Sequence, residues 1–462
     1  MIMSLESFMQ QALSRQSVTG RLLVAYSGGL DSTVLLHLMA QAKHQLDLTA
    51  SVIAVHVNHQ LAADANAWER HCESVCERLH IDFISERVDI NKNGKGLEDA
   101  ARDARYKVFE ALVEPNDILL MAHHSNDQAE TFLLRLMRGA GVLGLSAMPA
   151  ERALGTGKLW RPLLEVSRDE LEAYANKNNC QWVEDASNVS LNFDRNFLRH
   201  KIIPTLASRW PQAIKQLQTT CARLEQVQHL LCDLAAIDLQ DLDECVERHG
   251  LIISYQKCAA LSAGRISNVL RYWCSKKGFA APSSDQLSQI HTQFFNAGAQ
   301  QSSAVVTWGA CECRQFNNRL YLMPLLASFR PPAKYMSVGE GNKVKLGVAG
   351  ELVLNKAMFK TQKLSIRWRQ GGERCTPINR AHSQTVKKLL QEYQLETWLR
   401  DRVPLIYCDD QLVAVADLWL CKEIASYVNI ENDKSVASAG NNIEHEPTQQ
   451  LSDKKLLVWS LY

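Results

Sequence analysis

The clearest chemistry in the sequence lies in one loop, Ser27-Gly28-Gly29-Leu30-Asp31-Ser32. Two glycines let the backbone approach a phosphate closely, and a helix that starts here adds N–H donors and a partial positive charge. Ser27 and Ser32 can add hydroxyl donors. Asp31 would repel a phosphate unless a Mg²⁺ ion lies between them. The loop therefore predicts a site for a magnesium-bound nucleotide. The alternative is a Ser/Gly turn in which Asp31 caps a helix and no ligand binds.

Other nucleotide-binding motifs are excluded by the sequence. The glycine pattern of a dinucleotide-binding turn does not follow the first apolar run. The kinase-like phosphate loop also fails, because Gly157-Lys158 is followed by Leu159 and position 152 is Arg. Neither a dehydrogenase nor a kinase-like enzyme is supported.

A second group of chemically capable residues is His123, His124 and Asp127, which follow an apolar run. Asp127 could share a Mg²⁺ ion with Asp31, whereas no thiolate or further histidine completes a tetrahedral zinc set. The alternative is a helix start, with Ser125 and Gln128 as a capping box and acidic residues favoured by the helix dipole.

Two arginines on one predicted helix face form a third candidate. Arg102 and Arg105 lie three positions apart and could hold a triphosphate or an acidic substrate. Glu98 and Arg102, four positions apart, equally suit an ordinary surface ion pair.

These residues need a scaffold, and the first 140 residues predict one. Apolar runs at 22–28, 51–58, 82–88 and 117–124 alternate with helical patterns near 32–39, 64–80, 97–113 and 125–138. Continuous apolar strands separated by helices predict a doubly wound α/β domain with a parallel sheet. Ligands of such domains bind at the carboxyl ends of the strands, where the loop and the histidines lie.

The remainder of the chain has a different pattern. Helical patterns at 213–237, 257–278 and 284–297 are followed by short strands, and 327–350 has the composition of a linker. Strands near 351–368 and 404–420 flank one amphipathic helix at 384–400. We therefore predict a catalytic domain at 1–212, a mostly helical middle domain at 213–330, an α+β C-terminal domain at 351–430 and a flexible acidic segment at 431–450.

Charge is distributed unevenly among these segments. The net charge of the 462 residues is +1, which alone argues against a nucleic-acid partner. However, residues 1–210 carry net −4, whereas 356–402 carries net +7. Cations that alternate with aromatic residues suit phosphate contact, although a solvated basic helix is the alternative. We expect Trp368, Tyr393 and Trp398 to serve mainly in packing. The candidate contacts to nucleic-acid phosphate in this segment are Arg367, Arg369, Arg374, Lys387, Lys388, Arg400 and Arg402.

Composition also bears on the compartment. No apolar run approaches the roughly 18 residues of a membrane span, and the N-terminal residues lack the features of a signal peptide. Thirteen irregularly spaced cysteines suit reduced, mostly buried thiols better than a disulfide framework. Both observations predict a cytoplasmic protein without a membrane partner.

The loop at 27–32 resembles the PP-loop of ATP pyrophosphatases, which split ATP into AMP and pyrophosphate. Further blocks, taken in order, are similar to the tRNA(Ile)-lysidine synthetase family, although Gln60 stands where that family suggests Gly. The N-terminal blocks are Val57-Asn58-His59-Gln60-Leu61, Glu98 with Ala101, Arg102, Arg105 and Tyr106, His123 to Thr131, Glu184-Asp185-Ala186-Ser187-Asn188, and Arg195-Asn196 with Arg199. The C-terminal blocks are Arg367 with Gly371 and Arg374, Lys387-Lys388-Leu389, and Trp398 to Arg402 with Pro404.

The resemblance implies a fold like that of adenine nucleotide alpha hydrolases and a ligase that uses ATP and Mg²⁺. It implies that free L-lysine is joined to C2 of the wobble cytidine in an isoleucine tRNA with a CAU anticodon, through an adenylated base. A homodimer is compatible with it. The implied catalytic or Mg²⁺-associated residues are Asp31, Asp127, His123 and His124. The implied substrate contacts are His59, Arg102, Arg105, Asp185, Asn188, Arg195 and Arg199, and the resemblance implies that the candidate phosphate contacts of segment 356–402 are predicted tRNA contacts.

Three alternatives predict different chemistry. A tRNA thiolase with this loop would need paired cysteines, but Cys72 and Cys76 are four apart, Cys311 and Cys313 are two apart, and no CxxC occurs. A glutamine-dependent amidotransferase would need a nucleophilic cysteine with a partner histidine, and no such signature stands out. A non-catalytic RNA-binding protein with the same fold would release no pyrophosphate.

Overall fold

The computed structural model describes residues 4–46, 48–60, 64–90, 96–184, 191–247, 250–296, 304–332, 336–338, 342–355, 359, 363–427 and 457–460. Contacts divide the chain into two compact units, Met1–Leu230 and Leu231–Tyr462. The three-domain division drawn from the sequence stays a prediction. Among the described residues, no helix combines the length and apolar character that crossing a membrane requires.

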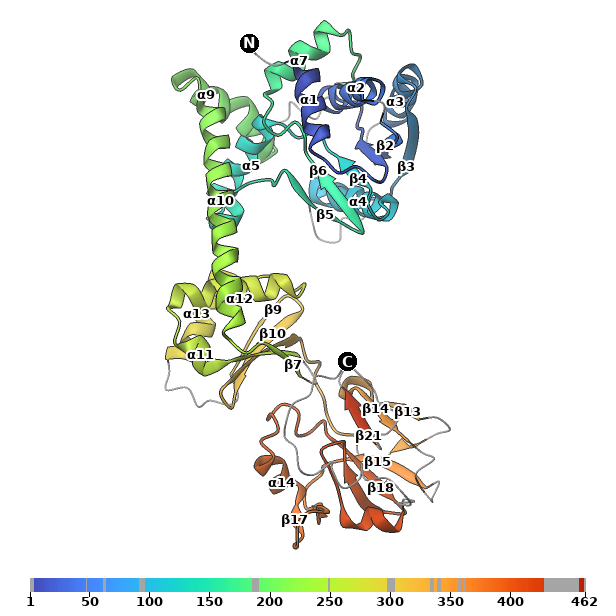
Figure 1. Ribbon diagram of the computed structural model, residues 1–462, viewed down its shortest axis with the longest axis vertical. Coiled ribbons are helices and arrows are strands. Elements are labelled where there is room, and N and C mark those ends of the chain that lie inside the picture. Colours follow the sequence, from blue (N-terminus) through green and yellow to red (C-terminus); the bar gives the residue numbers. More distant parts are fainter. Residues whose placement is uncertain are drawn as a thin grey trace. The chain divides into compact units, whose positions relative to one another are not determined.

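The first unit is built on a six-stranded sheet with the order β3-β2-β1-β4-β6-β5 (Figure 1). Its strands are β1 Leu22–Ala25, β2 Val52–Asn58, β3 Asp82–Arg87, β4 Ile118–Leu120, β5 Glu151–Leu154 and β6 Gly157–Trp160. All neighbouring strands pair in parallel except β5, which is antiparallel to β6. The predicted doubly wound parallel sheet is therefore confirmed. Because β2 and β4 flank β1 on opposite sides, the strand order reverses at β1, where such sheets bind ligands.

Helices cover both faces of this sheet. One core lies between the sheet and α1 Leu5–Ser14, α2 Leu30–Gln45, α3 Ala65–Leu79 and α7 Arg168–Lys177. A second core joins the other face to α4 Leu97–Leu112 through Phe109 and Val113. The strands read as continuous apolar runs because both of their faces are buried.

The remaining helices of this unit follow the sheet's strands. They are α5 Ser125–Met137, α6 Val142–Leu145, α8 Asp194–Phe197, a π-helical segment Leu198–Ile202, α9 Ile203–Arg209 and the first part of α10 Ala213–Gln240, whose last residues belong to the second unit. Helix α5 starts directly after β4, so its first turn lies at the carboxyl end of the sheet.

The second unit contains two sheet systems. The first combines α11 Tyr255–Ala259, α12 Ala263–Lys276, α13 Ser284–Ile290 and a π-helical segment His291–Asn296 with an antiparallel sheet of order β7-β8-β11-β10-β9. These strands are β7 Cys245–Glu247, β8 Gly250–Ser254, β9 Val305–Trp308, β10 Cys311–Phe316 and β11 Arg319–Pro324. The predicted helices are present, and the sheet completes their core through residues such as Val306 and Leu322, which belong to the same cluster as Trp273 of α12.

The C-terminal part of this unit is a mixed α+β region, as predicted. Its main sheet has the order β12-β15-β18-β19-β20, and a three-stranded sheet has the order β13-β14-β21. Its elements are β12 Met336–Ser337, β13 Lys343–Lys345, β14 Glu351–Leu354, β15 Leu364–Trp368, β16 Arg374–Cys375, β17 Gln384–Thr385, α14 Val386–Glu392, β18 Pro404–Cys408, β19 Gln411–Val415, β20 Trp419–Leu420 and β21 Leu457–Ser460.

Two predictions for this region need correction. The helix predicted at 384–400 is only α14, because Thr385 caps its start and Gln394 adopts a left-handed backbone at φ +55° just after it. The segment 327–350 is not solely a linker, since β12 pairs with β15 and β13 pairs with β14. The predicted flexible segment 431–450 lies outside the described residues.

The aromatic residues of the basic segment are mostly in the core. Trp368 is 3% exposed. The Trp398 ring lies 5.2 Å from Tyr321 and 5.9 Å from Phe316, and so ties the segment after α14 to the sheet of β10 and β11. Packing is confirmed for these two residues. Tyr393 differs, because it is 46% exposed.

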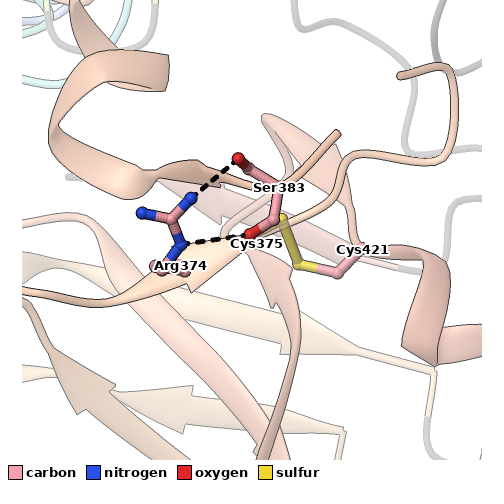
Figure 2. Close-up of a disulfide and its surroundings, with 4 residues drawn as sticks. All are labelled: Arg374, Cys375, Ser383 and Cys421. Carbon is pink, nitrogen blue, oxygen red and sulfur yellow. Dashed lines mark hydrogen bonds between the residues drawn. A yellow bond between two sulfur atoms is a disulfide. The ribbon is translucent and has the colours of Figure 1, made fainter. Parts of the chain in front are cut away.

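Most of the cysteines are free thiols, as the sequence predicted. Cys72 and Cys258, for example, are buried free thiols, and burial raises the pKa of both to about 12. The exception is a disulfide between Cys375 on β16 and Cys421, which follows β20 (Figure 2). It joins the short β16–β17 hairpin to the main sheet.

Candidate active site

The predicted phosphate loop lies between β1 and α2. Gly28 has φ +82°, and a Cβ atom there would lie 2.8 Å from the Cys72 sulfur, so only glycine fits. Ser32 Oγ donates to the Gly29 carbonyl at 3.0 Å and lies 3.0 Å from Ser27 Oγ. Gly29 is the N-cap of α2 and offers no side-chain cap. The first N–H groups of this helix therefore suit an anion.

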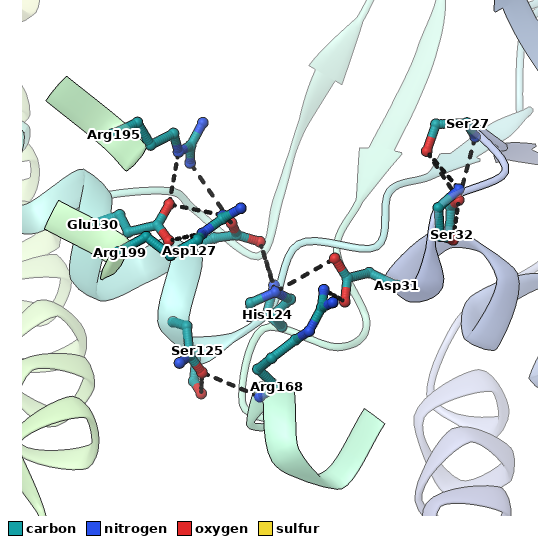
Figure 3. Close-up of polar contacts among 12 residues, drawn as sticks. Ser27, Asp31, Ser32, His124, Ser125, Asp127, Glu130, Arg168, Arg195 and Arg199 are labelled. Carbon is teal, nitrogen blue, oxygen red and sulfur yellow. Dashed lines mark hydrogen bonds and ion pairs between the residues drawn. The ribbon is translucent and has the colours of Figure 1, made fainter. Parts of the chain in front are cut away.

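Asp31 and Asp127, which lie on different helices, converge on one histidine (Figure 3). His124 Nε2 lies 3.6 Å from Asp31 Oδ2 and 3.5 Å from Asp127 Oδ2. Burial alone would lower the pKa of His124, but the two carboxylates outweigh burial and the pKa is raised. Arg168 Nη1 lies 2.5 Å from Asp31 Oδ1 on the other side. Asp31 is thus paired with Arg168, and Asp127 lies 3.3 Å from Arg199 Nη2, in the free protein.

The two carboxylates suit a magnesium ion that is shared with a nucleotide. Both carboxylates lie within 3.6 Å of the same atom, His124 Nε2, so they are close neighbours, and Mg²⁺ prefers hard oxygen ligands of this kind. Among the described residues there is no group of three or more metal-binding side chains. Phosphate and water would have to complete the coordination, as is common for magnesium in nucleotide sites.

Next to this pair lies a buried carboxylate held by two arginines. Glu130 on α5 is 0% exposed, and its oxygens accept from Arg195 Nε at 2.8 Å and from Arg199 Nε at 2.6 Å. Arg199 Nη2 also lies 3.3 Å from Asp127 Oδ1. Arg199 lies within the π-helical segment 198–202, a kind of distortion that often marks functional sites. The segment 194–202 is thereby fixed to the site.

His123 is held in one neutral form by a buried arginine. Arg161, which follows β6 and is 4% exposed, donates from Nε to His123 Nδ1 at 3.1 Å. A guanidinium has no acceptor, so Nδ1 carries no proton and Nε2 carries it. Burial lowers the pKa of His123 to about 3, and this keeps the ring neutral. His123 is therefore a fixed hydrogen-bond donor at the end of β4.

The structure brings together six of the predicted residues: Asp31, His123, His124, Asp127, Arg195 and Arg199. His59 and Arg105 lie near each other, since Arg105 contributes, after burial, to a lowered pKa of His59. Asp185 and Asn188 lie outside the described residues. The capping box of Ser125 and Gln128, which was the alternative interpretation of this segment, is not formed, because Asp127 Oδ2 accepts from the His124 amide and Gln128 bonds the backbone of Met148.

The sequence patterns did not indicate the roles of three residues of the site, Arg161, Arg168 and Glu130. Arg168 and Arg161 pair with Asp31 and His123, which are 137 and 38 positions away, so no local pattern links them. In the sequence, Glu130 could be interpreted only as an acidic residue that the dipole at the start of a helix favours. Its place one helical turn after Asp127, on the same face of α5, was the available signal.

The predicted tRNA-contact cations differ in their surroundings. Lys387, Lys388 and Arg374 are exposed. Arg369 lies 2.5 Å from Asp401, Arg367 contacts Asp410 and stacks on Tyr407, and Arg400 donates to the Leu395 carbonyl. Arg402 is only 6% exposed and donates to the carbonyls of Val348 and Ala327. Because that guanidinium is used within the protein, we assign Arg402 a structural role.

The sheet, the glycine loop and the facing acids define a PP-loop ATP-using domain, and residues 3–206 match the family model of the PP-loop domain. Residues 255–321 match the TilS substrate binding domain, and 364–434 match the TilS substrate C-terminal domain. The chain belongs to the tRNA(Ile)-lysidine synthase family, which are ATP-dependent ligases.

Individual relatives support this assignment along most of the chain. The chain is 42% identical over 410 residues to the tRNA(Ile)-lysidine synthase of Coxiella burnetii, which covers 86% of this chain and 89% of that protein. It is 39% identical over 419 residues to that of Serratia proteamaculans, covering 88% and 93%. It is 42% identical over 403 residues to that of Pseudomonas fluorescens, covering 86% and 88%.

Proposed function

We propose that this protein uses ATP to join free L-lysine to C2 of the wobble cytidine in the CAU anticodon of an isoleucine tRNA. The products would be lysidine, AMP and pyrophosphate, and the tRNA would then read AUA as isoleucine. The observation that carries the proposal is the convergence of Asp31 and Asp127 beside the phosphate loop, in a chain of this family.

The first step would activate the base. The C2 oxygen of cytosine is a poor leaving group, so it must attack the α-phosphate of ATP and expel pyrophosphate. The N–H groups at the start of α2 and the hydroxyls of Ser27 and Ser32 stabilise the charge that develops on the phosphates. A magnesium ion held by Asp31 and Asp127 would neutralise phosphate charge when bound. Reaching the pocket requires the base to be splayed out of the anticodon loop.

The second step would join the amine. The ε-amine of lysine has an ordinary pKa near 10.4, so it must lose a proton before it adds to C2 and AMP leaves. The Nε2–H of His123 is placed to donate a hydrogen bond to an oxygen at the end of β4. We propose Arg102, Arg105, Arg195 and Arg199, with His59, as contacts to the anionic groups of the substrates.

Lysine, the tRNA and a cytoplasmic location are parts of this proposal. The exposed cations Arg374, Lys387 and Lys388 are the proposed tRNA contacts of the C-terminal region. The homodimer stays a prediction, which light scattering of the purified chain would test.

A reaction with labelled lysine, ATP and the isoleucine tRNA tests the function directly. We expect one lysine per tRNA and stoichiometric AMP, with the modified nucleoside identified as lysidine by mass. Release of AMP and pyrophosphate without lysine incorporation would contradict the proposal, and a sulfur-containing nucleoside would favour the thiolase alternative.

Replacing both Lys387 and Lys388 with glutamine should weaken tRNA binding and reduce its salt dependence. Each lost phosphate contact lowers the slope of log K against log salt by about 0.9. Binding measured between low and moderate salt checks this. Lys177→Gln, an exposed lysine at the end of α7, is the control. An unchanged slope would place the tRNA contacts elsewhere.

Replacing Arg161 with methionine should allow His123 to carry its proton on either ring nitrogen. We expect kcat to fall by about 10-fold to 100-fold, as for other small misplacements of reacting groups, with little change in KM for ATP. The ¹⁵N spectrum of labelled histidine, with His123 assigned by His123→Gln, reports which nitrogen carries the proton. Arg161→Lys keeps a donor and should retain the wild-type tautomer. A wild-type spectrum for Arg161→Met would refute the role of Arg161.

A further inference from the structure

Four arginines gather at the edge of the candidate site, three of them around Tyr106 and the fourth, Arg135, near Arg102. They are Arg102 on α4, Arg135 on α5, Arg152 on β5 and Arg161 after β6. The Cζ atoms of Arg102 and Arg152 each lie 5.0 Å from the centre of the Tyr106 ring, and Arg102 Nη2 lies 3.5 Å from the Tyr106 hydroxyl. Arg161 joins this arginine cluster to the site through its bond to His123.

Within the described part of the chain, the ion pairs near the site involve Arg168, Arg195 and Arg199 and none of these four arginines. Instead, the N–H groups of three of them donate to backbone carbonyls. Arg135 donates to Gly144 and Ala147 at 2.9 and 2.6 Å, Arg161 donates to Pro149 at 2.7 Å, and Arg152 donates to Ala153 at 3.0 Å. A carbonyl satisfies a donor but does not neutralise its charge.

The charges in the cluster act on one another. Burial lowers the pKa of Arg135, and nearby Arg102 lowers it further. Burial also lowers the pKa of Arg161, and the like charges of Arg152 and Arg102 add to this effect. Burial raises the pKa of Tyr106, but the surrounding arginines outweigh it and the pKa is lowered. Such repulsion is unfavourable in the free protein, and a bound anion would relieve it.

We propose that the arginine cluster is a binding site for a phosphate group. Planar guanidinium groups match phosphate oxygens in pairs, and half-buried Arg102, Arg135 and Arg152 retain access to solvent. The identity of the ligand rests on the proposed function, in which two molecules could supply the phosphate group. One is a phosphodiester of the tRNA anticodon loop, and the other is the pyrophosphate that leaves the α-phosphate.

Binding measurements on the full chain test this site without requiring turnover. The variants are Arg135→Gln and Arg152→Gln, and Arg78→Gln, an exposed arginine in the last turn of α3, is the matched control. The probes are inorganic pyrophosphate and an RNA stem-loop with a CAU anticodon, each titrated at several salt concentrations. Thermal unfolding midpoints verify that every variant folds.

If the source is RNA, both variants should bind the stem-loop about tenfold more weakly, with a salt slope smaller by about 0.7 to 0.9, and bind pyrophosphate normally. If the source is pyrophosphate, the same loss should appear for pyrophosphate alone. Wild-type affinity of both variants for both probes would overturn the site. A loss of equal size in Arg78→Gln would also overturn it, because the effect would then be one of overall charge.

The proposed function is judged separately by wild-type lysidine formation. A wild-type chain that binds a probe through the arginine cluster but forms no lysidine would refute the function and leave the site standing. A chain that forms lysidine at the wild-type rate with both arginines replaced, and with both affinities unchanged, would refute the site alone.

Discussion

Replacing Asp31 with asparagine is expected to lower pyrophosphate release by about 100-fold or more while tRNA binding stays unchanged. Loss of one preorganised charge at a reacting phosphate commonly has an effect of this size. Asparagine keeps the shape of the side chain but removes the charge that faces His124 Nε2 at 3.6 Å and Arg168 at 2.5 Å. The pair of acids that suits magnesium would be reduced to Asp127 alone.

The measurement is pyrophosphate release in the presence of lysine and tRNA, with tRNA affinity determined separately. Asp169→Asn is the matched control, because Asp169 is an exposed aspartate in the first turn of α7. Ser32→Ala, which removes the hydroxyl bonded to the Gly29 carbonyl, should also reduce release. Normal activity of both Asp31→Asn and Ser32→Ala would remove the loop from the mechanism.

The parts of the site that local sequence determines were predictable. The glycine loop lies at the end of a buried strand, and Gly28 is required by its positive φ and by the nearby Cys72 sulfur. Asp127 follows β4 by only a few residues, so the parallel sheet alone places it at the same edge as Asp31. The alternation of apolar strands with periodic helices was sufficient for this, because both patterns are local signals.

Contacts between distant segments were not predictable from the same patterns. Arg168 and Arg161 reach partners that are distant in sequence, and the capping box of Ser167 and Glu170 beside Arg168 indicates only the start of a helix. The short strands β12 and β13 exist because β15 and β14 pair with them, which their own composition does not indicate. Arg402 looks like any other cation of the basic segment, and only its burial on two carbonyls separates it from Lys387.

The largest structural effect is expected for Glu130→Gln. This change leaves Arg195 and Arg199 beside a neutral amide. Its oxygen can accept a hydrogen bond, but its NH2 group cannot replace the second carboxylate oxygen as an acceptor. Breaking a buried ion pair costs about 3–5 kcal/mol, and the cost here should be nearer about 2 kcal/mol because the arginine side chains are 27% and 36% exposed. The unfolding midpoint should therefore fall by about 4–8 °C. Glu110→Gln, an exposed glutamate on α4, should leave the midpoint unchanged.

A double variant separates the structural role of Glu130 from its role in the reaction. In Glu130→Gln with Arg199→Met, one orphaned cation is gone, so part of the lost stability should return. Lysidine formation should stay low, because Arg199 also approaches Asp127 at 3.3 Å and orders the acids of the site. Recovery of both stability and activity would mean that Glu130 and Arg199 only hold the segment 194–202 in place. Recovery of stability alone would assign this ion pair to the chemistry, since the fold would then be intact without it.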